Sequence, residues 1–128
     1  MIILDHNIPR DQAEQLRRRR IHLRQIGFQV GRPEWDDQQE ILRYLHAAKQ
    51  VTFFTRDLGF FRAPLRHASY CLVILTVPVL HTAQYISKFL RHSHFNTRAK
   101  RNGKIIRISP KSITIWEIGR QRRSTARW

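Results

Sequence analysis

The chain has 128 residues and a single cysteine. This length predicts one domain that can bury a core, and a single cysteine excludes a disulfide framework within the chain. Its 24 Lys and Arg residues outnumber nine Asp and Glu residues, which gives a formal net charge of +15. A domain this basic usually binds a polyanion, and nucleic acid is the first candidate.

No apolar run reaches the length of a membrane-spanning helix, and the N-terminus begins with a strand-like segment rather than a basic leader. Cys71 lies inside an apolar run, which is typical of a buried structural thiol. We therefore expect a soluble protein of the reducing cytoplasm that does not associate with a membrane.

Positive and negative charges are divided between the two ends of the chain. From Arg91 onward there are eleven Lys or Arg residues and one acid, whereas the other eight acids occur at or before Asp57. We expect the basic half to hold a phosphate backbone. The residues selected for this role are Arg91, Arg98, Lys100, Arg101 and Lys104.

The first elements alternate between strand and helix. Residues 2–4 are apolar and predict a buried strand, and Pro9 favours the start of a helix over residues 10–25. We expect Gly27 to end this helix and residues 28–30 to form a short second strand.

The alternation continues through the rest of the chain. A second helix is expected to begin at Asp36 or Asp37, either of which can cap it, and to end near residue 48. The expected elements that follow are a strand at residues 51–55, a helical turn at 58–61, a strand at 70–77, a helix at 81–91 and a hairpin at 105–108 and 113–116.

Strands that alternate with helices predict a three-layer α/β fold with a mostly parallel sheet and a C-terminal β-hairpin. We assign residues 1–119 to this domain. Residues 120–128 are basic and lack a periodic apolar pattern, which is typical of a disordered tail.

Two aspartates stand at the downstream ends of apolar strands. Asp5 comes after residues 2–4, and Asp57 comes shortly after residues 51–55. In a parallel sheet both carboxylates lie at the carboxyl edge, where α/β folds bind ligands. Glu40, on the second helix, is the expected third carboxylate, with Asp37 as the competing choice.

Three converging carboxylates repel one another unless a cation neutralises them. Mg²⁺ or Mn²⁺ suits carboxylate and water ligands. Such an ion activates a water and stabilises the charge on a phosphodiester under attack, so the pattern predicts metal-assisted hydrolysis of a nucleic acid. For a single aspartate at a strand end, however, a turn or capping role is the commoner explanation.

These motifs resemble a known family. The segments Leu4-Asp5-His6-Asn7-Ile8-Pro9, Glu40-Ile41-Leu42 and Phe54-Thr55-Arg56-Asp57 are similar to those of small PIN-like proteins related to the virulence-associated ribonuclease toxins of toxin–antitoxin pairs. Motifs carry the resemblance over roughly residues 1–75. In the rest of the chain, only the order of the strands and helices is similar.

The resemblance implies a Rossmann-like PIN fold, dependence on Mg²⁺ or Mn²⁺, an RNA substrate and a small antitoxin protein. The basic surface would bind an acidic segment of that antitoxin. It implies that Asp5, Asp57 and Glu40 or Asp37 are metal ligands, with supporting roles for His6, Asn7, Thr55 and Arg56. Gly59 stands where many relatives have a second acid, and no fourth carboxylate follows except Glu117. The chain therefore carries enough ligands for one ion but not clearly for two.

Two other functions remain open. A non-catalytic nucleic-acid-binding domain would keep the basic half without a metal. A metal-independent toxin ribonuclease would use His92, His94 and nearby arginines as acid and base. A His-x-His pair in a cationic segment more often faces solvent or contacts phosphate than binds a metal, so a metal site at His92 and His94 is the weaker interpretation. The sequence leaves both a monomer and a homodimer open.

Overall fold

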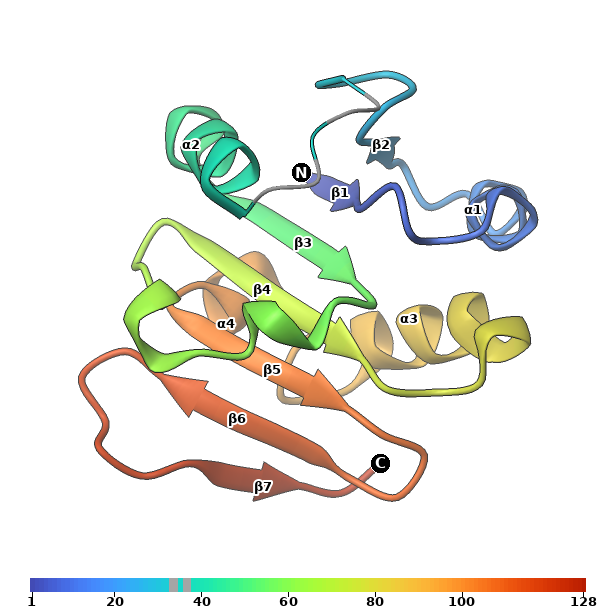
Figure 1. Cartoon of the computed structure of the whole chain (residues 1–128). Helices are drawn as coiled ribbons and strands as arrows, with labels where there is room; N and C mark the ends of the chain where they lie inside the picture. The colour runs from blue at the N-terminus through green and yellow to red at the C-terminus, as the bar shows by residue number, and fades with distance from the viewer. Residues whose placement is uncertain (33–34, 36–37) are drawn as a thin grey trace.

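In the computed structural model, residues 1–32, 35 and 38–128 are described. Within this part of the chain, seven strands form one sheet in the order β2-β1-β3-β4-β5-β6-β7 (Figure 1). Strands β1 to β5 are mutually parallel, whereas β6 and β7 are antiparallel to their neighbours. The predicted α/β class with a mostly parallel sheet is confirmed.

The strands are β1 (Ile2–Leu4), β2 (Arg24–Gln25), β3 (Val51–Thr55), β4 (Tyr70–Leu75), β5 (Lys104–Ile108), β6 (Ile113–Glu117) and β7 (Ser124–Ala126). The α-helices are α1 (Arg10–Arg18), α2 (Gln38–Ala48), α3 (Thr82–Arg91) and α4 (Arg98–Arg101). Three 3-10 turns complete the described part of the chain: η1 (Leu58–Phe60), η2 (Ala63–Leu65) and η3 (Val79–His81).

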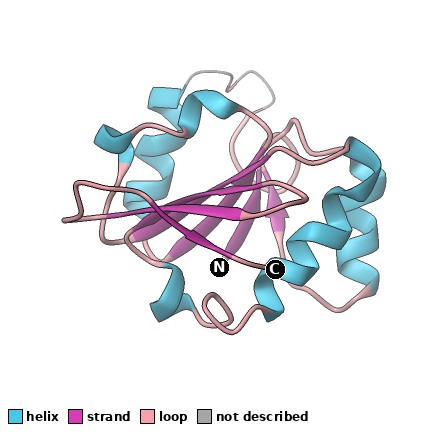
Figure 2. Ribbon diagram, turned by 90° about the horizontal axis from the view of Figure 1, so that it is seen from below, coloured by secondary structure: helices cyan, strands magenta, loops and turns pink. Residues whose placement is uncertain are grey.

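Helices lie on both sides of the sheet (Figure 2). Successive residues of a strand point to opposite faces, and Phe53 and Phe54 accordingly belong to two separate hydrophobic cores. Phe54 packs in the core that includes residues of α1 and α3, and Phe53 packs with residues of α2. All five side chains of β3 are buried, because both faces of this central strand are covered.

The first helix is shorter than the sequence predicts. It ends at Arg18 instead of extending to residue 25, and Arg20 adopts a left-handed backbone with φ of 63°. The run of arginines at its end supplies no apolar side chain to continue packing on the sheet.

The second strand was also predicted at the wrong residues. Arg24 and Gln25 pair with β1, whereas Phe28 is 60% exposed. Only an isolated bridge between Ile26 and Val30 lies in the predicted region. The apolar character of Phe28 was misleading because this side chain does not enter the core.

The end of the chain, for which the sequence suggested a disordered tail, includes a strand. Strand β7 pairs with β6, and the Trp128 indole Nε1 donates a hydrogen bond to the Ser109 carbonyl over 2.7 Å. The polar sequence of β7 suits a strand at the edge of a sheet, and such a strand has no apolar alternation to reveal it. Among the described helices, none has the length and apolar character needed to cross a membrane.

Candidate active site

Asp5 continues β1 at the carboxyl edge of the sheet, and its side chain is almost completely buried. Its main-chain N–H donates to the Phe54 carbonyl over 2.8 Å, which extends the ladder to β3. From the end of β3, the Thr55 hydroxyl donates to Asp5 Oδ2 over 2.6 Å. This threonine therefore contacts the candidate ligand directly, and its supporting role stays a prediction.

Three further donors surround the Asp5 carboxylate. The His6 main-chain N–H and the His6 imidazole Nδ1 lie 2.8 Å and 2.7 Å from Oδ1, and the Asn7 amide Nδ2 donates to Oδ2 over 3.3 Å. With Thr55 this makes four contacts, which matches the acceptor capacity of a carboxylate. These contacts compensate the loss of water on burial.

Asn7 and Arg56 join the loops that follow β1 and β3. The Asn7 side-chain oxygen accepts from the Arg56 main-chain N–H over 3.1 Å, and Asn7 Nδ2 also donates to Thr55 Oγ1 over 3.2 Å. The Arg56 guanidinium donates to the Val77 carbonyl over 2.9 Å and to Thr82 Oγ1 over 3.3 Å at the start of α3. Both side chains fix the positions of these loops.

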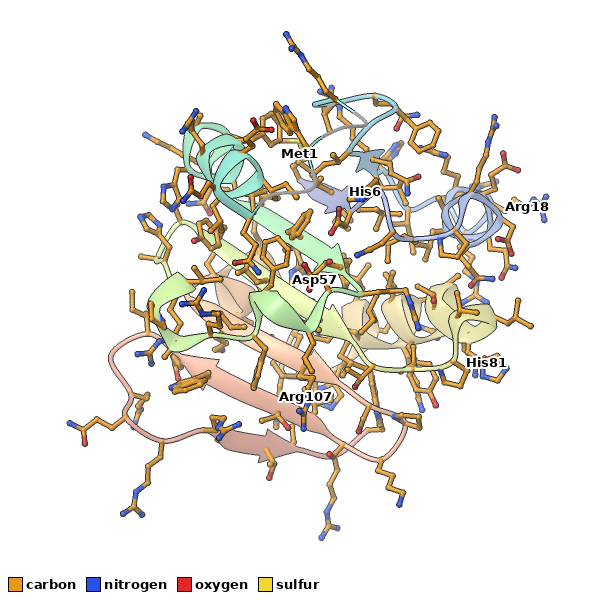
Figure 3. The ribbon with its side chains drawn as sticks, in the orientation of Figure 1. Met1, His6, Arg18, Asp57, His81 and Arg107 are labelled. Carbon is orange, nitrogen blue, oxygen red and sulfur yellow. The ribbon has the colours of Figure 1, made fainter. Side chains whose placement is uncertain are left out.

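Asp57 lies at the same edge of the sheet, and it is exposed (Figure 3). Its main-chain N–H donates to Thr55 Oγ1 over 3.0 Å, so Thr55 contacts both candidate ligands. Asp57 Oδ1 accepts from the Gly59 N–H over 2.8 Å and thereby caps η1. Asp57 Oδ2 makes no hydrogen bond to any residue that the structure describes.

The first residue of α2, Gln38, lies close to Gly59 in this turn. A Cβ atom at residue 59 would lie 2.6 Å from the Gln38 amide Nε2 and 3.0 Å from Asp57 Oδ1. Gly59 has no side chain at the position where many members of the resembled family have an acid. This absence permits α2 to pack closely against the turn.

Glu40 occupies a different face of α2 from the buried Ile41. With other residues, mainly of α2, it lines a surface pocket of about 380 Å³; the others are Arg32, Trp35, Arg43, Tyr44 and Ala47. Asp36 and Asp37, the expected caps, lie outside the described residues. Within the described residues, no group of three or more His, Cys, Asp or Glu side chains is placed to hold a metal ion.

Gln25 is a structural determinant of the site that the sequence did not reveal. Its buried amide Nε2 donates to the main-chain carbonyls of Asp5 and Ile8 over 3.0 Å and 2.8 Å. The side chain thus holds both ends of the loop that follows β1. A glutamine in a two-residue polar strand gives no periodic signal in the sequence. The contact of Gln25 with the loop becomes apparent only from the parallel pairing of β2 with β1.

The predicted phosphate-binding residues on α4 and at the start of β5 lie away from the two aspartates. Helix α4 directly precedes β5, so Arg98, Lys100 and Lys104 are at the amino edge of the parallel strands. Arg101 is buried and donates to Thr52 Oγ1 and to the Phe95 carbonyl, both over 2.9 Å. These contacts weigh against a backbone-binding role for Arg101, because its guanidinium is used inside the fold.

The alternative catalytic pair is also engaged in structural contacts. His92 Nε2 lies 2.6 Å from the Arg127 carbonyl, and His92 Nδ1 accepts from the His94 main-chain N–H over 3.1 Å. A carbonyl can only accept, so Nε2 carries the proton and both ring nitrogens are occupied. These contacts attach the end of the chain to α3 and weigh against a general acid or base role for His92.

Comparisons of the chain with protein-family models, with curated proteins and with solved structures gave no significant match.

Proposed function

We propose that this protein is a divalent-metal-dependent ribonuclease of the PIN-like type, centred on Asp5 and Asp57. The observation that carries the proposal is the connection of both residues through Thr55 Oγ1, which bonds the Asp5 carboxylate and the Asp57 main chain. Two carboxylates on adjacent parallel strands thereby share the edge at which α/β folds bind ligands. The net charge of +15 supports a polyanionic substrate.

The donor set at this edge fits Mg²⁺ or Mn²⁺. Mg²⁺ is commonly held by one or two carboxylates together with waters and substrate phosphate oxygens, so a complete cage of protein ligands is not required. Asp57 Oδ2 and Asp5 Oδ2 are the atoms that would hold the ion. When bound, it would activate water and stabilise charge on the phosphodiester.

The neighbouring side chains prepare Asp5 for this role. Thr55 and His6 hold one carboxylate oxygen each, at 2.6 Å and 2.7 Å, so the orientation of the group is set before any ligand arrives. The contact from Asn7 Nδ2 is longer, at 3.3 Å, and is the one most easily exchanged for an ion. Asp57, being exposed, can meet the substrate directly.

The test is cleavage of an end-labelled single-stranded RNA by purified protein, titrated with Mg²⁺ or Mn²⁺ and repeated in excess chelator. Asp57→Asn should reduce metal-dependent cleavage by roughly a hundredfold, since it removes a ligand charge. Asparagine retains the capping oxygen for η1, so folding should persist. Glu14→Gln on α1, an exposed site, is the matched control and should cleave at the normal rate.

Full activity of Asp57→Asn, or equal cleavage in chelator, would contradict the proposal. A second function, non-catalytic nucleic-acid binding, is favoured by one observation: protein donors fill the acceptor positions of Asp5. In that case RNA should bind without being cut at any metal concentration, and Asp57→Asn should leave binding unchanged.

A restraining partner is part of the proposal. The basic surface offers an acidic protein segment a strong electrostatic docking site, and a small antitoxin of this kind would prevent damage to the host. Growth should therefore stop when the chain is expressed alone and recover on co-expression with the adjacent open reading frame. Equal growth in both cases, with soluble protein confirmed, would argue against a toxin.

A further inference from the structure

The sheet extends beyond the helices on the α2 side. In Figure 1, α2 lies beside the start of β3 and the short turns that follow β3 lie in front of β4 and β5, whereas no helix is drawn in front of β6 and β7. At the boundary of this open area, Phe61 and Trp116 pack against the edge of the α2-side core. Their ring centroids are 6.0 Å apart, and both side chains remain partly exposed.

Three arginines stack on these two rings. The Arg107 guanidinium lies 5.5 Å from the Phe61 centroid, and the Arg66 guanidinium lies 5.4 Å from the Trp116 centroid. Arg123 contacts both rings, at 5.8 Å and 5.1 Å. We refer to Phe61, Arg66, Arg107, Trp116 and Arg123 as the arginine–aromatic face.

The positive charges of the face are not neutralised within the described part of the protein. None of its arginines forms an ion pair with a described carboxylate, and the guanidinium groups of Arg107 and Arg123 make no hydrogen bond to a described residue. Arg66 is the most constrained of the three, because it donates to the Glu117 and Arg120 carbonyls over 2.7 Å and 2.6 Å. Neighbouring uncompensated guanidinium groups create a local positive potential suited to an anionic ligand.

We propose that the arginine–aromatic face binds single-stranded RNA. Unpaired bases would stack on Phe61 and Trp116 and on the guanidinium planes, while Arg107 and Arg123 contact phosphates. Aromatic rings beside cationic side chains favour a single strand, since a duplex keeps its base faces stacked inside. The positive charge and the partly exposed rings of the face together match this ligand better than either property alone.

The basic group at the amino edge of the parallel strands, formed by Arg98, Lys100 and Lys104, lacks this combination. Lys104 lies 6.0 Å from the Phe95 ring, but Phe95 is buried and cannot stack on a base. Arg98 and Lys100 are exposed and stack on no described ring. That edge therefore offers only non-specific phosphate contacts.

The face also leads to the candidate active site. Phe61 directly follows η1, and Asp57 caps the start of the same turn. In the view of Figure 3, Asp57 lies between His6 and Arg107. A single-stranded RNA bound to the face can therefore extend toward Asp57. The delivery of RNA to Asp57 rests on the proposed nuclease function, whereas the binding itself does not.

The experiment measures fluorescence anisotropy of a labelled 12-nucleotide oligouridine in excess chelator, so that cleavage plays no part. Arg107→Gln/Arg123→Gln should weaken binding at least tenfold and lower the salt dependence by about 1.4 in logarithmic slope, the value for two lost single-strand phosphate contacts. Phe61→Leu should weaken binding by roughly fivefold or more through lost stacking. Arg98→Gln/Lys100→Gln removes the same charge at the amino edge and should change affinity by less than about threefold.

Equal losses in the two double variants would overturn the proposal, because they would indicate only general electrostatics. Preference for a blunt RNA duplex over the single strand would also overturn it. Single-stranded DNA of the same length tests for a role of the 2′-hydroxyl, and tighter binding to DNA would exclude RNA as the intended ligand. Asp57→Asn should bind normally, because the face does not include Asp57. If the unaltered protein binds the oligouridine but cleaves no RNA with Mg²⁺ or Mn²⁺, the nuclease is rejected and the face is kept.

Discussion

Thr55 and Asp5 lie at the ends of adjacent parallel strands and share a hydrogen bond of 2.6 Å. The same hydroxyl oxygen accepts from the Asp57 N–H and from the Asn7 amide. Thr55 therefore joins the two candidate ligands and the loop between β1 and α1. Because it is fully buried, water cannot replace these contacts if the hydroxyl is removed.

Thr55→Val should lower the free energy of unfolding by about 1–3 kcal/mol, since it leaves buried polar groups without a partner. Thr55→Ser keeps the hydroxyl and should lose less. Chemical denaturation at neutral pH measures both. Thr125→Val, at an exposed position in β7, is the control and should shift stability by no more than about 0.5 kcal/mol. An equally stable Thr55→Val protein would show that the network contributes nothing to folding.

Arg101 should behave as a core residue despite its charge. Burial lowers the pKa of its guanidinium, and the side chain bonds Thr52 and the Phe95 carbonyl. Arg101→Met should reduce the free energy of unfolding by about 1–3 kcal/mol, because both acceptors lose their donor. Arg98→Met, exposed on the same helix, should be nearly neutral. Similar melting temperatures for the two variants would contradict this assignment.

Trp128 should stabilise the end of the chain. Its ring lies 5.5 Å from the Tyr85 ring and 5.0 Å from the Lys88 ammonium, in addition to its hydrogen bond to Ser109. Trp128→Ala should cost roughly 1–2 kcal/mol of stability and shift the near-ultraviolet circular dichroism spectrum. Arg127→Ala removes an exposed side chain while leaving the main-chain carbonyl that contacts His92, and it should be close to neutral.

The sequence predicts elements best where both the core and the turns leave local signals. Strand β3 was predicted at its observed bounds because an apolar run stands between two polar connections. The hairpin of β5 and β6 follows from two apolar runs around Ser109-Pro110-Lys111-Ser112. By contrast, the polar strands β2 and β7 are defined by pairing with a neighbour, which no local pattern encodes.

The same distinction holds for the sites. The positions of Asp5, Thr55 and Asp57 at the carboxyl edge could be predicted because each lies at or just after the end of an apolar strand, and their role there stays a prediction. The arginine–aromatic face combines side chains from residue 61 to residue 123, and only the folded sheet brings them together. The charge of Arg101 likewise gave no indication that its side chain is buried.

Alkaline pH should destabilise the protein through two buried groups. Burial raises the pKa of the Cys71 thiol to about 12, and it raises the pKa of the Tyr70 hydroxyl to about 12 as well. In the unfolded chain these groups lose their protons near pH 9 and pH 10, so the folded state binds more protons above pH 9. The free energy of unfolding should therefore fall as pH rises from 8 to 10, by roughly 1–2 kcal/mol.

Urea denaturation at pH 7, 8 and 10 measures this effect. Neither group changes its charge between pH 7 and 8, so the decrease that they cause should begin only above pH 8. Cys71→Ala removes the thiol and should flatten the alkaline decrease by about 1 kcal/mol, after allowance for the stability of the variant at pH 7. If Cys71→Ala follows the same pH profile as the unaltered protein, the buried thiol is not the source of the decrease.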